Sequence, residues 1–291
     1  MSAPAHTNSI FRSCLYVPGH QPERISTAYA SEADAVILDL EDAVPASLKA
    51  KAREIVAEIT AGPTPKPTYV RVNSAASGLR DGDVLAVAGA GLVGVRLAKA
   101  GSAEEIRGAA RLLRQAGSAA VIHVLIETAS ALEHAFDLAT ASPLVGMLGL
   151  GESDLRVDLG AAPESATMDA GRARVIVASR AANLPNPCQS VYPEPRDLRG
   201  LLVTSRRGRR LGFIGRMAIH PAQIPIIHEV YTPKPDEIDD ARSICEAARL
   251  AAEQDKSIVI AASGRMVGPP AVARAKQVLQ LAQALQLIEI G

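Results

Sequence analysis

The sequence contains no tryptophan, and aromatic residues make up only 3% of its 291 residues. Surfaces that bind single-stranded nucleic acids rely on aromatic side chains for base stacking, so this composition argues against such a role. An excess of one charge is also missing, because 31 basic residues balance 31 acidic residues. Neither a nucleic acid nor an anionic membrane is therefore expected as a partner.

One local cluster of positive charge stands out from this neutral background. It consists of Arg206, Arg207, Arg209 and Arg210. The cluster is interpreted either as a solvated helix face or as a binding site for an anion such as a nucleotide phosphate.

Cysteines are few and widely spaced, at Cys14, Cys188 and Cys245, with no CxxC pair. This pattern predicts a reducing compartment and no zinc site. Residues 1–9 lack the charged and then apolar order of a signal peptide. No apolar run reaches the roughly 20 residues that span a bilayer. We therefore expect a cytoplasmic protein without a membrane partner.

Short apolar runs alternate with helical stretches along most of the chain. The strand candidates are 14–17, 35–40, 68–72, 93–98, 121–126, 145–150, 190–192 and 213–219. Most are apolar throughout, which is typical of parallel strands covered on both faces. The helical stretches between them include 102–115, with a Ser102–Glu105 capping box, and 130–141. Eight such units predict a (β/α)8 TIM barrel. A doubly wound sheet is the alternative, because a sequence does not show whether a sheet closes.

The pattern changes towards the C-terminus, where Pro233 and Pro235 interrupt the chain. A helix over 236–254, a short strand over 257–262 and a final helix over 271–287 are predicted. We therefore expect a catalytic barrel in residues 1–230. Residues 231–291 are expected to form a C-terminal helical lid and oligomerisation extension that covers the barrel mouth.

Polar side chains follow six of the eight predicted strands, and barrel active sites lie at the carboxyl ends of strands. These residues are Asp39, Glu41, Asp42, Arg71, Asn73, Lys99, Glu127, Thr128, Glu152, Ser153, Asp154 and His220. Glu127 and Asp154 end two apolar runs, where an unpartnered charge would be costly. Mg²⁺ takes one or two carboxylates and leaves room for substrate and water. The two strand ends therefore predict a magnesium site.

The charged residues after the second and third strands have two interpretations. Asp39, Glu41 and Asp42 could cap the next helix or pair with Arg12 or Arg71. Arg71 could neutralise an acid, but its place between two apolar residues at a strand end suits bidentate binding of a substrate carboxylate.

Three other polar residues have structural interpretations. Lys99 could form a Schiff base, although a surface or ion-pair role is the favoured interpretation. His220 precedes a proline and is expected to start a helical segment, and His123 is expected in the core.

Several motifs together resemble the citrate lyase β-subunit-like (CitE-like) family of the HpcH/HpaI aldolase superfamily, over residues 11–287. The motifs are 12–19 (RSCLYVPG), 37–44 (ILDLEDAV), 70–73 (VRVN), 126–129 (IETA), 154–155 (DL), 218–224 (AIHPAQI) and 264–267 (GRMV). No single motif is specific for the family, but their combination and order are.

The resemblance implies a TIM barrel that assembles as a homotrimer or as a hexamer of two trimers. It implies Mg²⁺ bound by Glu127 and Asp154, with Arg71 and Glu127 as catalytic and substrate-binding residues. Asp39, Glu41, Asp42 and Glu152 are expected to surround these groups. The implied reaction is a retro-Claisen cleavage of a short 3-hydroxyacyl thioester, of the citramalyl-, malyl- or citryl-CoA type. Its products are acetyl-CoA and a 2-oxo acid.

The chain departs from the family pattern at several positions. Gly268 replaces an aspartate that acts as an acid/base group on the lid of relatives, and Ser153 replaces the glutamate before Asp154. Glu152 is an added carboxylate, Ala131 replaces a glycine, and Cys188-Gln189 replaces Ile-Asp. Two alternatives to the lyase therefore stay open: a metal-dependent aldolase acting on a free 2-oxo-acid aldol, and a weakly active binding subunit. The acyl chain, its stereochemistry and the thiol carrier are not predicted.

Overall fold

The computed structural model describes residues 11–253, 259–260 and 266–289. The chain divides into two compact units, Met1–Val230 and Tyr231–Gly291. The roles expected for residues 231–291, as a lid and an oligomerisation extension, stay predictions.

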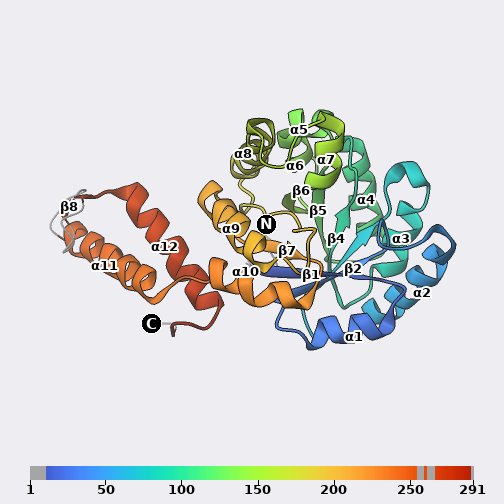
Figure 1. Cartoon of the computed structure of the whole chain (residues 1–291), viewed down its shortest axis with the longest axis horizontal. Coiled ribbons are helices and arrows are strands. Elements are labelled where there is room, and N and C mark those ends of the chain that lie inside the picture. Colours follow the sequence, from blue (N-terminus) through green and yellow to red (C-terminus); the bar gives the residue numbers. More distant parts are fainter. Residues whose placement is uncertain (1–10, 254–258, 261–265, 290–291) are drawn as a thin grey trace. The chain divides into compact units, whose positions relative to one another are not determined.

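The first unit is built on one parallel sheet of seven strands (Figure 1). These are β1 (Ser13–Pro18), β2 (Ala35–Asp39), β3 (Thr68–Val72), β4 (Leu92–Leu97), β5 (Val121–Ile126), β6 (Val145–Leu150) and β7 (Arg216–Ala218). Their order in the sheet is β6-β5-β4-β3-β2-β1-β7. Strands β2 and β5 are buried along their whole length, as their apolar sequences predict for parallel strands.

The predicted closed barrel of eight strands is wrong for the described residues, which form a half-barrel sheet with edges at β6 and β7. The expected strand over 190–192 does not form, and one isolated parallel bridge joins Gln189 to Arg216. Pro187 and Pro193 flank this segment and lack the N–H that a ladder requires, which explains its irregular conformation. The unreversed order from β1 to β6 also excludes a doubly wound sheet for this region.

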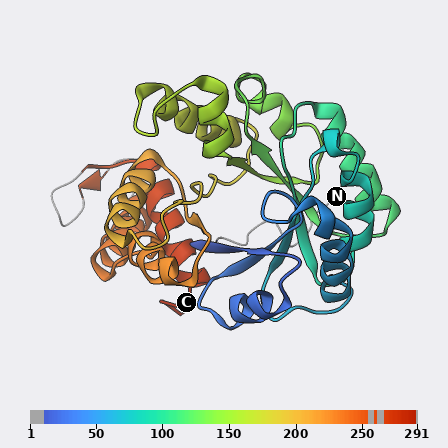
Figure 2. The same ribbon diagram turned by 45° about the vertical axis from the view of Figure 1, so that its right-hand side comes forward.

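Helices surround the curved sheet in Figure 2. They are α1 (Pro22–Ala30), α2 (Lys49–Thr60), α3 (Arg80–Val87), α4 (Ala103–Gln115), α5 (Ala129–Glu133), α6 (Ala135–Ala139), α7 (Glu152–Leu159), α8 (Ala166–Ala181), α9 (Leu198–Leu211) and α10 (Ile224–Tyr231), with the 3₁₀ turns η1 (Ala46–Leu48), η2 (Ala75–Ser77) and η3 (Pro221–Gln223). The N-cap half of the capping box before α4 is confirmed, because the Ser102 hydroxyl accepts a hydrogen bond from the Glu105 amide at 3.3 Å. The Glu105 carboxylate accepts the amide of Gly101, at 3.4 Å, in place of that of Ser102. The helix predicted over 130–141 is instead two short helices that meet at His134.

The inner side of the sheet carries two successive layers of side chains. The deeper layer is an apolar cluster of Phe11, Cys14, Ala35, Ile37, Tyr69, Val121, Met147, Cys188 and Met217. Above it, Asp39, Arg71, Arg96 and His123 pair in register on four neighbouring strands. This inner row of charged and polar residues separates the core from the carboxyl edge of the sheet.

The second unit consists of α11 (Pro235–Ala252), the antiparallel pair β8 (Val259–Ile260) and β9 (Met266–Val267), and α12 (Pro269–Ala284). Its two helices pack through a small core that includes Ile244 and Val267. Gly268 is the N-cap of α12, with φ −122°. Among the residues that the structure describes, no helix is both long and apolar enough to cross a membrane.

Candidate active site

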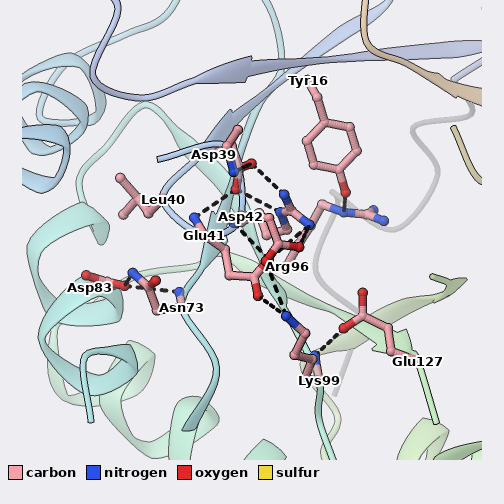
Figure 3. A network of polar contacts seen from close by, with 12 residues as sticks. Tyr16, Asp39, Leu40, Glu41, Asp42, Asn73, Asp83, Arg96, Lys99 and Glu127 are labelled. Carbon is pink, nitrogen blue, oxygen red and sulfur yellow. Dashed lines mark hydrogen bonds and ion pairs between the residues drawn. The ribbon is translucent and has the colours of Figure 1, made fainter. Parts of the chain in front are cut away.

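A cavity of about 250 Å³ lies at the carboxyl edge of the sheet in the first unit. Its lining includes Tyr16, Asp39, Arg71, Arg96, Glu127 and Asp154. Figure 3 shows the polar network around it, with side chains from β1 to β5 and their following loops converging on one region. Four of these six residues were predicted as site residues, whereas Tyr16 and Arg96 were not.

Asp39 and Arg71 form a tightly bonded pair on adjacent strands. The Arg71 Nε donates to Asp39 Oδ1 at 2.7 Å, and its Nη2 bonds the other carboxylate oxygen. Asp39 also accepts the amides of Glu41 at 2.9 Å and Ala43 at 3.2 Å, which fixes the loop after β2. The predicted pairing of Asp39 with Arg71 is therefore confirmed. The predicted capping of the next helix is wrong for Asp39, because its amide partners lie in the loop before η1, whose N-cap Pro45 receives no side-chain hydrogen bond.

The third nitrogen of Arg71 also faces acid groups. Arg71 Nη1 lies 3.1 Å from Glu41 Oε2 and 3.4 Å from Asp42 Oδ2. Burial opposes the charge of Arg71, but the hydrogen bonds and charge of Asp39 raise its pKa above its usual value. Arg71 lines the cavity while bonded to three carboxylates, and its role in binding substrate stays a prediction.

Lys99 forms the ion pair that was favoured over a Schiff base. Its Nζ donates to Glu41 Oε1 at 2.6 Å and to Asp42 Oδ1 at 3.2 Å. The backbone of Lys99 is left-handed, with φ +52°, a conformation that is costly for a residue with a side chain. Its amide N–H donates to Glu127 Oε2 at 2.5 Å. The strained backbone thus contributes to orienting Glu127.

Glu127 is a buried carboxylate at the end of β5, with 3% of its surface exposed. Burial raises the pKa of Glu127 to about 7; the Lys99 amide opposes this effect and the charge of Asp154 adds to it. Among the described residues Glu127 forms no ion pair with a cationic side chain. Two neighbouring carboxylates of this kind repel each other unless a proton or a cation lies with them.

Asp154 lies in the first turn of α7 and lines the same cavity as Glu127. Gly151 is required between them, because a Cβ at this position would lie 2.5 Å from Glu127 Oε1. The described residues contain no group of three or more His, Cys, Asp or Glu side chains placed to hold a metal ion. Mg²⁺ needs only one or two carboxylates when substrate and water complete its ligands, so Glu127 and Asp154 fit this ion.

Arg96 is a second buried guanidinium in the cavity, with 3% of its surface exposed. Its Nε donates to the Tyr16 hydroxyl at 3.0 Å, and its Nη1 lies 3.2 Å from His123 Nδ1. Burial, and then the charge of Arg96, lower the pKa of His123 well below its usual value, so the imidazole is neutral and accepts this hydrogen bond. The signal that sequence reasoning missed was an arginine inside the apolar run of β4.

Other predicted residues lie at the border of the cavity or away from it. Glu152 forms an ion pair with Arg172 on α8, so the added carboxylate has a cationic partner. Asn73 donates to Asp83 Oδ2 at 2.6 Å, on the far side of the network in Figure 3. His220 caps η3, where its Nδ1 accepts the Ala222 amide at 3.1 Å, which confirms a structural role.

The arginine cluster lies on α9 and makes contacts within the chain. Arg206 Nη2 lies 3.0 Å from Glu229 Oε1, and Arg207 forms an ion pair with Asp169. These two contacts favour the interpretation as a helix face over that as an anion site.

A parallel α/β sheet with buried carboxylates and guanidinium groups at its carboxyl edge defines a class of protein: a small-molecule enzyme with charge chemistry in a confined cavity. Residues 12–221 match the HpcH/HpaI aldolase/citrate lyase family. The chain belongs to this family, as its motifs had suggested.

Named relatives and a solved structure cover almost the whole chain. The chain is 31% identical to citrate lyase subunit beta of Escherichia coli K12, over 94% of this chain and 93% of the relative. It is 33% identical to (3S)-malyl-CoA thioesterase of Cereibacter sphaeroides strain KD131, over 97% and 98%. The CitE protein of Mycobacterium tuberculosis, in complex with magnesium, acetoacetate and coenzyme A, is 28% identical with a TM-score of 0.77 and covers 94% of this chain and 98% of its own.

Proposed function

We propose that this protein is a Mg²⁺-dependent carbon–carbon lyase. It cleaves a short 3-hydroxyacyl thioester, of the citramalyl-, malyl- or citryl-CoA type, into acetyl-CoA and a 2-oxo acid. The observation that carries the proposal is the pair Glu127 and Asp154, two carboxylates without a cationic partner among the described residues, in one cavity with two guanidinium groups. Membership of the family and the magnesium and coenzyme A bound to the mycobacterial CitE support it.

Each residue has a role that follows from its environment. Mg²⁺ held by Glu127 and Asp154 would supply a Lewis acid that stabilises charge on the substrate oxygen. Arg71 adds a positive charge whose position is fixed, because Asp39 binds one edge of its guanidinium through two hydrogen bonds. Lys99 keeps Glu127 in position through its amide. The burial of Glu127 excludes water from one side of the reacting groups.

A second candidate is hydrolysis of the thioester bond. The similarity to (3S)-malyl-CoA thioesterase favours it, since this relative is 33% identical over 97% of the chain. The two reactions differ in the bond that breaks. The lyase breaks a carbon–carbon bond and keeps the thioester, whereas the thioesterase releases a free thiol and an intact hydroxy acid.

Gly268 bears on the aldolase and binding-subunit alternatives. It offers no side chain for proton transfer at the start of α12. A free 2-oxo-acid aldol would place less demand on such a group, because the 2-oxo acid itself becomes the enolate.

We also propose a homotrimeric or hexameric assembly and a cytoplasmic location, which rest on the family resemblance and on the cysteine pattern. Light scattering of the purified protein tests the assembly.

One assay separates these activities. Purified protein is incubated with Mg²⁺ and either citramalyl-, malyl- or citryl-CoA or a free 2-oxo-acid aldol, and the 2-oxo acid, acetyl-CoA and the free thiol are measured. Equal amounts of 2-oxo acid and acetyl-CoA, abolished by EDTA and restored by Mg²⁺, are expected for the lyase. Thiol without 2-oxo acid identifies the thioesterase, and cleavage of a free aldol alone identifies the aldolase. Full activity in EDTA would refute the metal role.

A further inference from the structure

Arg96 carries a full charge that no acidic side chain among the described residues balances. The guanidinium stays protonated in proteins, and a buried charge is costly unless an opposite charge accompanies it. Its partners, the Tyr16 hydroxyl and the neutral His123 ring, are uncharged. The described residues place no carboxylate within ion-pair distance of Arg96. Arg71, its neighbour in register on β3, carries the same charge, but three carboxylates match it.

Arg96 and Arg71 differ in the charge of their partners. Arg71 directs its nitrogens to Asp39, Glu41 and Asp42. Arg96 lines the same cavity, and its Nη2 makes no hydrogen bond with any described residue. Figure 3 shows its guanidinium against the Tyr16 hydroxyl, away from the acid groups that follow β2. Arg96 is therefore the positive charge in the cavity that is available to pair with a bound anion.

Two glycines on β6 and just after it mark where this charge lies relative to the metal ligands. A Cβ at Gly149 would lie 3.1 Å from Arg96 Nη2, and a Cβ at Gly151 would lie 2.5 Å from Glu127 Oε1. The Arg96 guanidinium and the Glu127 carboxylate therefore both lie against the segment from Gly149 to Gly151, which lines the cavity that they share.

We infer that Arg96 binds the second carboxylate of a 2-oxo diacid whose 2-oxo-carboxylate end lies at Glu127 and Asp154. The inference rests on the proposed function and narrows it. Among the three thioester types, it selects the one whose cleavage releases a diacid such as oxaloacetate, over those that release pyruvate or glyoxylate. Arg96 is then a specificity-determining residue that contacts the substrate.

Calorimetric titration with fresh oxaloacetate and with pyruvate, each with Mg²⁺, tests the inference without requiring turnover. A charged hydrogen-bonded contact predicts that the wild-type protein binds oxaloacetate about 10- to 100-fold more tightly than pyruvate. Arg96→Met should reduce this ratio to about one, with the larger loss of affinity for oxaloacetate. Arg96→Lys, which keeps the charge but loses the planar fork, should give an intermediate ratio.

The outcomes separate this inference from the proposed function. Equal affinity of the wild-type protein for both acids, or an unchanged ratio in Arg96→Met, would overturn the role of Arg96 while Mg²⁺-dependent binding upheld the metal site. Binding of neither acid would overturn both proposals. If Arg96→Met does not fold, as judged by its melting curve, the wild-type ratio and Arg96→Lys decide the question.

Discussion

Two regions of the sheet edge hold acid groups in opposite ways. Next to β2 and β3, Asp39, Glu41 and Asp42 are bonded to Arg71 and Lys99. Next to β5 and β6, Glu127 and Asp154 share a cavity and form no ion pair with a described cationic side chain. The first region, here called the paired region, has its charges matched within the fold. In the second, the unpaired region, the two carboxylates have no cationic partner among the described residues. The difference teaches that unmatched charge indicates ligand binding better than the mere presence of charge.

The largest expected effect is the loss of activity when a carboxylate of the unpaired region is removed. Glu127→Gln and Asp154→Asn should each lower kcat/KM for the thioester about 10³-fold or more, because a lost metal ligand removes several kcal/mol of transition-state stabilisation. Steady-state kinetics with Mg²⁺ measure the loss. Glu133→Gln is the matched control, since the Glu133 side chain is 77% exposed. Full activity in either site variant would show that the unpaired region does not hold the metal.

A gain of activity would sharpen the comparison by supplying the missing acid/base group. Gly268→Asp should raise kcat about 10²-fold if the carboxylate transfers a proton in the reaction. The position accepts a side chain, because a Cβ there meets nothing nearer than Pro270 Cδ at 3.9 Å. Gly268→Asn keeps the shape and the helix cap without a carboxylate, so it is the matched control. An equal effect of both variants would exclude proton transfer.

Substitutions in the paired region should lower the free energy of unfolding. Asp39→Asn leaves Arg71 with only Glu41 and Asp42, and should lower the free energy of unfolding by about 2 to 3 kcal/mol. Urea unfolding with constant m-value measures this change. Asp81→Asn removes an exposed partner of Arg80 and should cost less than about 0.5 kcal/mol. A similar cost at both positions would mean that the paired region does not stabilise the fold.

Most of the strands were predictable, because buried parallel strands have continuous apolar sequences. Strands β1 to β6 match the predicted ranges to within one residue at each end. The seventh predicted strand failed, because periodicity ignores the N–H donors lost at Pro187 and Pro193. Closure of a barrel depends on pairing between distant segments, which no local pattern encodes.

Part of the site was predictable and Arg96 was missed, although Arg71 and Arg96 both lie one residue before the end of their strands. Glu127 and Arg71 were found at strand ends, and the structure places both in the cavity. Arg96 was overlooked because it lies inside a run that reads as core, and its exposure to the cavity depends on Gly149 of another strand. The two regions differ in whether their carboxylates have cationic partners. This property depends on the tertiary arrangement and not on the local sequence.

The smallest expected effect is a change in Mg²⁺ affinity of the unpaired region with pH. With the pKa of Glu127 at about 7, a proton competes with Mg²⁺ for this carboxylate. The affinity for Mg²⁺ should therefore fall towards about tenfold per pH unit as the pH drops below 7, and change little above 8. Calorimetry in buffers of different ionisation enthalpy should detect close to one released proton per Mg²⁺ at pH 6, and almost none at pH 8.5.

The same proton predicts the sign of a stability change in metal-free protein. Because burial raises the pKa of Glu127, the folded state holds this proton more tightly than the unfolded state. Its contribution to stability is therefore complete below the usual carboxyl range, and is lost as the pH rises to about 7. Glu127→Gln should lack this loss, so that above pH 7 without metal the variant is more stable than the wild-type protein by about 2 to 3 kcal/mol. Saturating Mg²⁺ should reverse the order, because only the wild-type protein binds the ion well. Parallel pH profiles of the two proteins in EDTA would show instead that Glu127 already has a partner, and the contrast between the two regions would then be lost.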